Sequence, residues 1–131
     1  MKDTGVSPVR ILVVEDEPVI ARVCLLTLTL EGFEADLAVN GKVAEGMLEQ
    51  GKYDLVLIDI RTPVMDGKQL FVSITEKHPE LVSRVIFTTG DVLGGNTKSF
   101  IEHSERLFLA KPFTPDELKA VVREALRGLQ K

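Results

Sequence analysis

From Arg10 onward, short runs of aliphatic and β-branched residues alternate with longer stretches in which apolar residues recur at helical spacing. Near-continuous apolar runs indicate strands buried on both faces, and the helical stretches between them would supply that cover. The pattern predicts one α/β domain with a five-stranded parallel sheet and helices on both faces. The predicted strands are Arg10 to Val14, Phe33 to Val39, Tyr53 to Asp59, Arg84 to Thr88 and Arg106 to Ala110, and the predicted helices cover 17–30, 41–50, 66–77, 95–102 and 115–128.

The predicted domain covers residues 9–131. Residues 1–8 show no periodicity and contain glycine, serine and proline, so we expect them to form a flexible lead-in. A chain of 131 residues with 44% hydrophobic content is large enough to bury one core without disulfides or structural metal.

The first predicted helix is apolar on more than one face. We expect Cys24 to pack in the core of the domain rather than to take part in redox chemistry. Leu25 and Leu28 would either broaden the core or form a partly exposed surface for a partner. The stripe that we expect to be buried consists of Val19, Ile20, Val23, Leu26 and Leu30.

The net charge of the chain and the sequence at its start indicate which classes of protein are not expected. The 16 basic and 20 acidic side chains leave a net charge of −4, so we expect no direct binding of nucleic acid. The single cysteine cannot form an internal disulfide, and the start of the chain does not resemble a secretion signal. Apolar runs are much shorter than the roughly 20 residues that span a bilayer. We therefore expect a cytoplasmic protein without membrane insertion.

Polar residues follow four of the predicted strands. In an open parallel sheet, ligands bind at the carboxyl ends of the strands, because loops and helix N-termini converge there. The sequence therefore predicts that acids, a hydroxyl group and a lysine share one edge of the sheet. These residues are Glu15 and Asp16 after the first strand, Asp59 after the third, Thr89 and Gly90 after the fourth, and Lys111 after the fifth.

The three acids predict a metal site. Glu15, Asp16 and Asp59 would repel one another unless a hard cation lay among them. Carboxylates, waters and phosphate oxygens are the ligands that Mg²⁺ prefers, so we expect a magnesium site here.

The remaining residues suit the transfer of a phosphoryl group to Asp59. A carboxylate can attack phosphorus when a metal ion and an ammonium group neutralise the transferred oxygens, and Lys111 would supply the ammonium. The hydroxyl of Thr89 would donate a hydrogen bond to a phosphoryl oxygen, while the small Gly90 leaves room for the group to enter.

Together these four ordered motifs resemble the receiver domain of bacterial two-component response regulators, over residues 9 to about 128. The segment from Asp59 to Gly67 is similar to the family's stretch that runs from the phosphoacceptor through a proline to Met-Asp-Gly. The resemblance implies a flavodoxin-like (βα)5 fold with strand order 2-1-3-4-5. It also implies a signalling switch that receives phosphate from a sensor histidine kinase or a histidine-phosphotransfer domain.

The family's site residues carry over one by one. By this similarity Asp16 and Asp59 bind Mg²⁺ directly, with Mn²⁺ or Ca²⁺ as substitutes. Glu15 acts largely through bound water, and the main-chain carbonyl of Arg61 supplies a further ligand.

The resemblance also implies a conformational switch. Lys111 would form a salt bridge to the phosphate, Thr89 would move toward it, and Phe108 would swing into the space that Thr89 leaves. The Lys111–Pro112 bond is expected to be cis. The face formed by the fourth helix, the fifth strand and the fifth helix would then change its affinity for a downstream target, and the protein is expected to be a monomer or a weak homodimer.

Two features depart from the common pattern of the family. Arg61 and Asp91 follow the phosphoacceptor and the switch threonine at the same spacing, and we hypothesise an ion pair that covers the acyl phosphate and slows its hydrolysis. Glu15 stands where aspartate is more common. The Thr-Gly-Asp and Gly-Gly of the segment 89–95 are similar to segments in receivers attached to hybrid sensor kinases, and a free-standing regulator fits almost as well.

Two other functions are alternatives to the signalling switch. A phosphohydrolase of the haloacid-dehalogenase type needs a second acid two residues after the nucleophile, where this chain has Arg61. We therefore expect no enzyme beyond its own phosphotransfer and slow autodephosphorylation. The alternative is a receiver-like adaptor that works without phosphorylation, which the complete set of acids, threonine and lysine disfavours.

Overall fold

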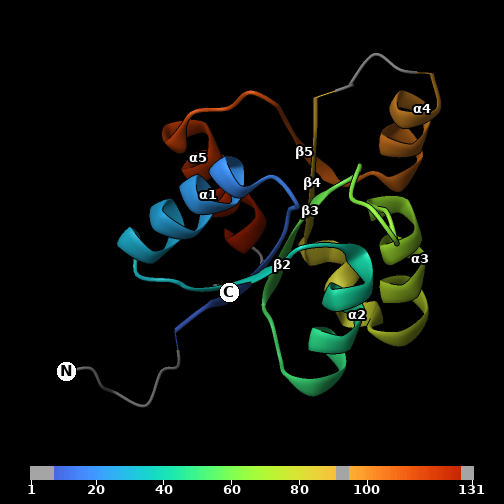
Figure 1. Ribbon diagram of the computed structural model, residues 1–131, viewed down its shortest axis with the longest axis horizontal. Helices are drawn as coiled ribbons and strands as arrows, with labels where there is room; N and C mark the ends of the chain where they lie inside the picture. The colour runs from blue at the N-terminus through green and yellow to red at the C-terminus, as the bar shows by residue number, and fades with distance from the viewer. Residues whose placement is uncertain (1–7, 91–94, 128–131) are drawn as a thin grey trace.

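The structure, a computed structural model, describes residues 8–90 and 95–127. It contains five strands, five α-helices and one 3₁₀ helix within these ranges (Figure 1). In chain order they are β1 (Arg10–Val14), α1 (Pro18–Leu30), β2 (Glu34–Ala38), α2 (Gly41–Gln50), β3 (Leu55–Asp59), α3 (Gly67–Lys77), η1 (Pro79–Arg84), β4 (Val85–Thr89), α4 (Gly95–Ser104), β5 (Leu107–Ala110) and α5 (Pro115–Leu126).

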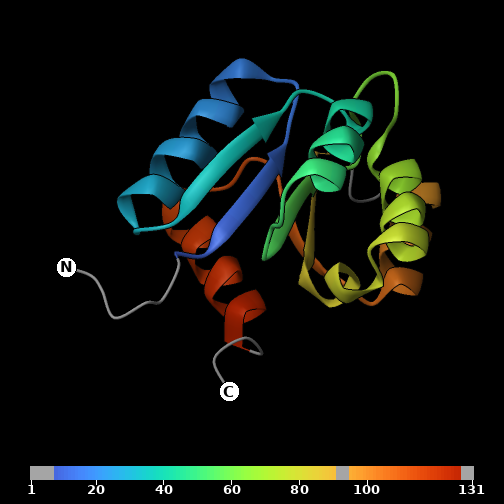
Figure 2. The same cartoon turned by 90° about the horizontal axis from the view of Figure 1, so that it is seen from below.

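The strands form one parallel sheet in the order β2-β1-β3-β4-β5. Each neighbouring pair is parallel, so all five strands end at the same edge. Figure 2 shows α1 and α5 on one face of the sheet and α2, α3 and α4 on the other. The predicted α/β fold, its strand order and its two helical layers are confirmed.

Two apolar cores lie on the two faces of the sheet. Because successive side chains of a strand point to opposite faces, β1 contributes Leu12 and Val14 to one core and Ile11 and Val13 to the other. Phe87 on β4 is the largest side chain that is fully buried. The continuous apolar runs of the sequence correspond to strands covered on both sides.

The face that α1 buries differs from the predicted stripe. Three members of that stripe are largely exposed, with relative exposures of 71% for Val19, 58% for Leu26 and 76% for Leu30. Apart from Leu28, the side chains that α1 buries are small, which lets the helix approach the sheet and α5 closely. The buried residues of α1 are Ala21, Cys24, Thr27 and Leu28.

The boundaries of several elements also differ. The predicted fourth strand began at Arg84, but residues Pro79–Arg84 form the 3₁₀ helix η1, which the sequence pattern did not predict. Pro79 has no amide hydrogen and stands at the start of this turn, a position that proline tolerates. β4 therefore starts at Val85 and extends through Thr89, one residue further than predicted. Residues 1–7, of the predicted lead-in, and residue 128 lie outside the described residues.

β2 is an edge strand whose charges are tied to the adjacent strand. Arg10 on β1 forms ion pairs with Glu34 at 3.6 Å and with Asp36 at 3.2 Å. The hydroxyl of Tyr53 donates a hydrogen bond of 2.7 Å to Asp36, and its ring lies under the Arg10 guanidinium. These charged contacts thus hold β2 to β1 near the start of β1. The acids that follow β1 and β3 lie at the other end of these strands.

Candidate functional site

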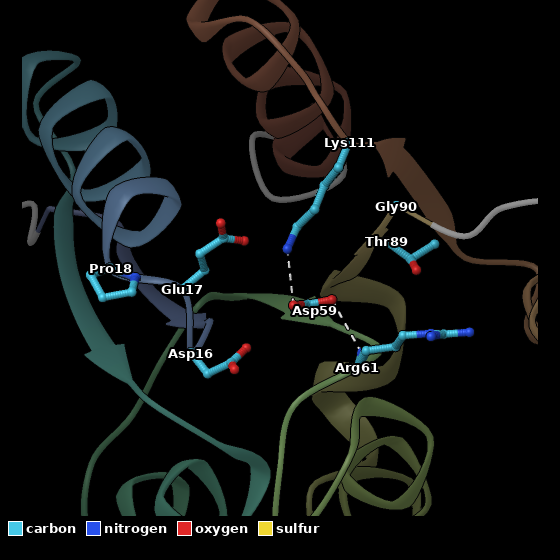
Figure 3. Close-up of a pocket in the computed structure, with 8 residues that line it drawn as sticks. All are labelled: Asp16, Glu17, Pro18, Asp59, Arg61, Thr89, Gly90 and Lys111. Carbon is cyan, nitrogen blue, oxygen red and sulfur yellow. Dashed lines mark hydrogen bonds and ion pairs between the residues drawn. The ribbon is translucent and has the colours of Figure 1, made fainter.

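A cavity of 530 Å³ opens at the carboxyl ends of the strands. Figure 3 shows that its side chains come from the ends of β1, β3, β4 and β5 and from the loops that follow them. The parallel sheet brings these positions together although they lie up to 95 residues apart in the chain, from residue 16 to residue 111. The lining residues are Asp16, Glu17, Pro18, Asp59, Arg61, Thr89, Gly90 and Lys111.

Asp59 is the last residue of β3 and is only 4% exposed. Its Oδ2 lies 3.0 Å from Lys111 Nζ, and its Oδ1 accepts a hydrogen bond of 3.1 Å from the amide of Arg61. Figure 3 shows both contacts, with the carboxylate between the lysine and the loop that follows β3. The carboxylate is therefore oriented by one charged and one main-chain donor.

Lys111 also pairs with Glu15. Its Nζ lies 3.0 Å from one carboxylate oxygen of Glu15 and 3.2 Å from the other. Burial alone lowers the pKa of Lys111, but the hydrogen bonds to Asp59 and Glu15 outweigh it and raise the pKa above the ordinary value. The lysine is thus held in its charged form.

The pKa of Glu15 is raised, chiefly because the side chain is buried and also because Asp59 is near. The hydrogen bonds from Lys111 and from the amide of Glu17 act in the opposite direction, the latter at 3.1 Å. Glu17, which follows the predicted first strand but was given no role from the sequence, also lines the cavity. Its position two residues after Glu15, in the loop after β1, was the available signal.

The three acids fit a divalent cation. Carboxylate oxygens of Glu15, Asp16 and Asp59 all lie within 4.8 Å of one another. Asp16 is exposed, whereas the other two side chains are buried. A site built only from oxygen donors matches the ligand preference of Mg²⁺. The role of the Arg61 carbonyl remains a prediction.

Thr89 and Gly90 lie at the end of β4, on the side of the cavity away from Asp16 (Figure 3). Thr89 is fully buried, and its carbonyl accepts a hydrogen bond of 3.0 Å from the amide of Lys111. Among the residues that the structure describes, a Cβ added to Gly90 would meet only the Cβ of Lys111, at 3.9 Å. The end of β4 is therefore joined to β5 at the lysine.

Phe108 does not line this cavity. It lies on β5 in register with Phe87 of β4, half-buried, and packs against the core beneath α3 and α4. Its role as a switch residue therefore remains a prediction. The Lys111–Pro112 bond, in the loop that follows β5, is cis, as the resemblance implies.

The partner that we expected for Arg61 cannot be placed, because Asp91 lies outside the described residues. The side chain of Arg61 extends from the loop after β3 and away from the Asp59–Lys111 pair, on the side of Thr89 (Figure 3). The hypothesis of a covering ion pair therefore stays a prediction.

The loop after β3 contains a tight turn that the sequence analysis missed. Val64 has a φ of 70° and is 79% exposed, and the amide of Met65 donates a hydrogen bond of 2.7 Å to the carbonyl of Pro63. This i to i+2 bond around a residue of positive φ describes a γ-turn, which is strained for a β-branched residue. The hydroxyl of Thr62 donates to the carbonyl of Met65 at 2.8 Å and closes the loop.

Gly67 lets α3 begin directly against the end of β3. A Cβ at this position would lie 2.7 Å from the Cα of Ile60 and 2.9 Å from the carbonyl oxygen of Asp59. Its amide donates a hydrogen bond of 2.8 Å to the carbonyl of Ile60. Asp66 caps the helix by accepting from the amide of Gln69. The Asp-Gly pair thus fixes the backbone that carries Asp59.

Comparison with known proteins identifies the class. The family model of the response regulator receiver domain matches residues 11–123, so the chain belongs to this family. The transcriptional regulatory protein PcoR of Escherichia coli is 38% identical over 119 residues, which is 90% of this chain and 51% of that protein. The chain thus spans about half the length of this relative.

Solved structures agree with this assignment. A CheY-like response regulator receiver domain protein from Methanospirillum hungatei aligns with a TM-score of 0.84 and 26% identity, over 93% of this chain and 96% of that one. The receiver domain of the sensor histidine kinase PA1611 from Pseudomonas aeruginosa aligns with a TM-score of 0.81 and 29% identity, over 92% and 98% of the two chains. That structure has a magnesium ion coordinated in its active-site cleft.

Within the residues described, none of the helices is long and apolar enough to span a membrane.

Proposed function

We propose that Asp59 accepts a phosphoryl group from a phosphohistidine and that the domain then changes its affinity for a partner. The observation that carries the proposal is the placement of the Lys111 ammonium 3.0 Å from a buried Asp59 carboxylate, inside a cluster of three acids. The donor would be a sensor histidine kinase or a histidine-phosphotransfer domain. Both supply the same phosphoimidazole chemistry.

In the proposed reaction an oxygen of Asp59 forms a bond to phosphorus while the P–N bond of the phosphohistidine breaks. The electron pair of that bond returns to the imidazole, which leaves neutral when its other nitrogen carries a proton. Mg²⁺, held by Glu15, Asp16 and Asp59, would neutralise charge on the transferred oxygens when bound. The Lys111 ammonium, 3.0 Å from Asp59 Oδ2, would neutralise further charge on the same oxygens.

After transfer, Thr89 is proposed to donate its hydroxyl hydrogen to a phosphoryl oxygen. Any movement of the end of β4 would pass directly to β5, because the amide of Lys111 is hydrogen-bonded to the Thr89 carbonyl. Phe108 lies three residues before that lysine. We therefore propose that the face formed by α4, β5 and α5 reports the phosphorylation state.

The test is phosphorylation of the purified protein by acetyl phosphate, followed by intact mass. The wild type should gain one phosphoryl group when Mg²⁺ is present and none without a divalent cation, and Mn²⁺ or Ca²⁺ should substitute in part. Asp59→Ala should gain none. Asp116→Ala, which removes a carboxylate that is 94% exposed on α5, is the matched control and should behave as the wild type.

A wild type that takes up no phosphate under any of these conditions would contradict the proposal. The family assignment would stand, and the domain would then be a receiver-like adaptor that works without phosphorylation. A gain of mass that persists in Asp59→Ala would show that another residue is the acceptor.

A further inference from the structure

Three phenylalanine rings join α3, β4 and α4. The ring centroids of Phe71 and Phe87 are 5.2 Å apart, those of Phe87 and Phe100 are 5.2 Å apart, and those of Phe71 and Phe100 are 5.9 Å apart. All three pairs meet edge to face, at interplanar angles of 69°, 69° and 90°. This arrangement places the positive edge of one ring against the negative face of the next, so every ring contributes to two favourable contacts.

α4 depends on this contact more than the other helices do. Of its ten residues only Thr97 is buried, and its two large apolar side chains, Phe100 and Ile101, are half-buried against the core. Figures 1 and 2 show α4 beside α3 at one side of the sheet. Lys68 on α3 adds a further restraint, because its Nζ lies 5.8 Å from the centroid of the Phe100 ring.

The same rings lie next to the proposed switch. Phe87 precedes Thr89 by two residues on β4, so both side chains point to the same face of the sheet. Phe87 is also in register with Phe108 on β5, and Phe108 packs in the same core. A turn of Phe108 toward Thr89 and a movement of α4 would therefore both disturb the rings.

We propose that Phe71, Phe87 and Phe100 form an aromatic clamp that holds α4 in its resting position and so sets how readily the domain switches. The inference rests on the proposed function, since the switch that the clamp opposes is the one driven by Asp59. Edge-to-face contacts depend on orientation, so α4 loses them when it shifts, even where apolar burial is kept. Such a differential contact is what biases an equilibrium between two conformations.

The test uses Phe100→Leu, which keeps an apolar side chain but removes the ring from α4. Phe33→Leu is the matched control, because Phe33 is half-buried in the core on the opposite face of the sheet. Lys68→Met keeps all three rings and removes only the cation, so it tests the clamp with a surface change. Two quantities are measured, namely amide hydrogen exchange of α4 in the unphosphorylated protein and the rate of phosphoryl uptake from acetyl phosphate with Mg²⁺.

Phe100→Leu should lower the protection of α4 amides by about tenfold, without a similar change in α1, α2 or α5. It should also take up phosphate several-fold faster than the wild type, since the population of the switched state rises. Lys68→Met should change both quantities in the same direction by a smaller factor. Phe33→Leu should change neither the α4 amides nor the rate of uptake.

Normal protection of α4 in Phe100→Leu would overturn the clamp. Lower protection with an unchanged or slower rate of uptake would also overturn it, because the rings would then only stabilise the fold. If the wild type takes up no phosphate, the proposed function fails, but the proposed coupling is still tested. Beryllofluoride with Mg²⁺ then serves as the probe in place of the phosphoryl group. If the clamp exists, Phe100→Leu binds beryllofluoride more tightly than the wild type does. Equal binding by the two proteins, or no binding by either, excludes the clamp.

Discussion

Lys111, which is half-buried, and Asp59, which is buried, form an ion pair in which the lysine Nζ lies 3.0 Å from the carboxylate Oδ2. The same ammonium contacts Glu15, so one cation holds together two acids that would otherwise repel each other. The lysine thus neutralises part of the negative charge that a bound metal ion would otherwise neutralise. Its removal should change the affinity of the site for cations as well as its chemistry.

We expect Lys111→Met to bind Mg²⁺ about tenfold more tightly than the wild type, because the uncompensated acids attract the cation more strongly. The same variant should take up phosphate from acetyl phosphate more slowly. Isothermal titration with MgCl₂ measures the affinity. Lys119→Met, a half-buried lysine on α5 that pairs with Glu31, is the control and should leave Mg²⁺ binding unchanged. Equal affinity in Lys111→Met would show that the ammonium does not compete with the metal.

Arg61→Ala should lose its phosphate faster than the wild type, by several-fold, if the arginine shields the acyl phosphate from water. Arg61 lines the cavity beside Asp59. The measurement follows the loss of phosphoryl mass after the donor is removed. Arg123→Ala, on α5, serves as the control for loss of one positive charge. An unchanged lifetime in Arg61→Ala would remove the shielding role.

The stability of the fold should depend on the ionisation of Glu45. Its pKa lies below the ordinary value because Ser73 donates a hydrogen bond to it and, to a lesser degree, because Lys77 and Lys42 are near. A lowered pKa stabilises the folded state above the unfolded value of 4.5, and this contribution is lost as the pH falls through the folded pKa. Glu45→Gln should therefore lower the free energy of unfolding by about 0.5 kcal/mol at pH 7 and by less at pH 3.

Urea denaturation at the two pH values measures this difference. Ser73→Ala should remove part of the same stabilisation, since it deletes the main hydrogen-bond donor to Glu45. If Glu45→Gln has the same effect at pH 3 as at pH 7, the contribution does not come from ionisation.

Val64→Gly should raise the free energy of unfolding by about 1 kcal/mol, because glycine adopts a positive φ without strain. Val72→Gly makes the same change at an exposed position of α3, where the backbone is helical, and should be destabilising by about 1 kcal/mol. The two variants are compared by thermal or urea unfolding. A destabilised Val64→Gly would mean that the valine side chain makes contacts worth more than the strain.

Gly67→Ala and Gly46→Ala should have opposite effects. The new methyl group at 67 would meet the backbone of Asp59 and Ile60, so we expect a loss of about 2 kcal/mol and slower phosphorylation of Asp59. At 46, within α2, a Cβ would meet no neighbouring atom of the described residues within 4 Å, and alanine should stabilise the helix by about 0.5–1 kcal/mol. Denaturation and phosphoryl uptake together check the pair. Normal uptake by Gly67→Ala would show that the loop can shift without moving the carboxylate.

The shared edge of the acids and the lysine could be predicted from simple rules, whereas the order of the strands was implied by the resemblance to the family. Continuous apolar runs that alternate with helical stretches are typical of a covered parallel sheet, and parallel strands all end at one edge, so Glu15, Asp59 and Lys111 were expected to meet there. Periodicity could not choose the buried face of α1, because the helix carries large apolar residues on several faces. Packing selected Ala21 and Cys24, whose small size decides how closely α1 lies on the sheet.

Other features depend on contacts between distant segments and therefore left no pattern in the sequence. The γ-turn at Val64 requires the backbone to reverse between Pro63 and Met65, and valine itself disfavours that conformation. The three rings of the aromatic clamp come from α3, β4 and α4, and each of them resembles an ordinary core phenylalanine in the sequence. Only the packed structure shows that they meet.

The charges on β2 have a consequence for how this domain behaves beside other proteins. An edge strand with free amide and carbonyl groups can recruit a further strand and seed aggregation. β2 carries Glu34 and Asp36, so an incoming strand would have to bury acids that Arg10 now neutralises within its own sheet. The β2 edge can therefore lie against neighbouring domains, as in a module tethered near other sheets, without merging with their strands.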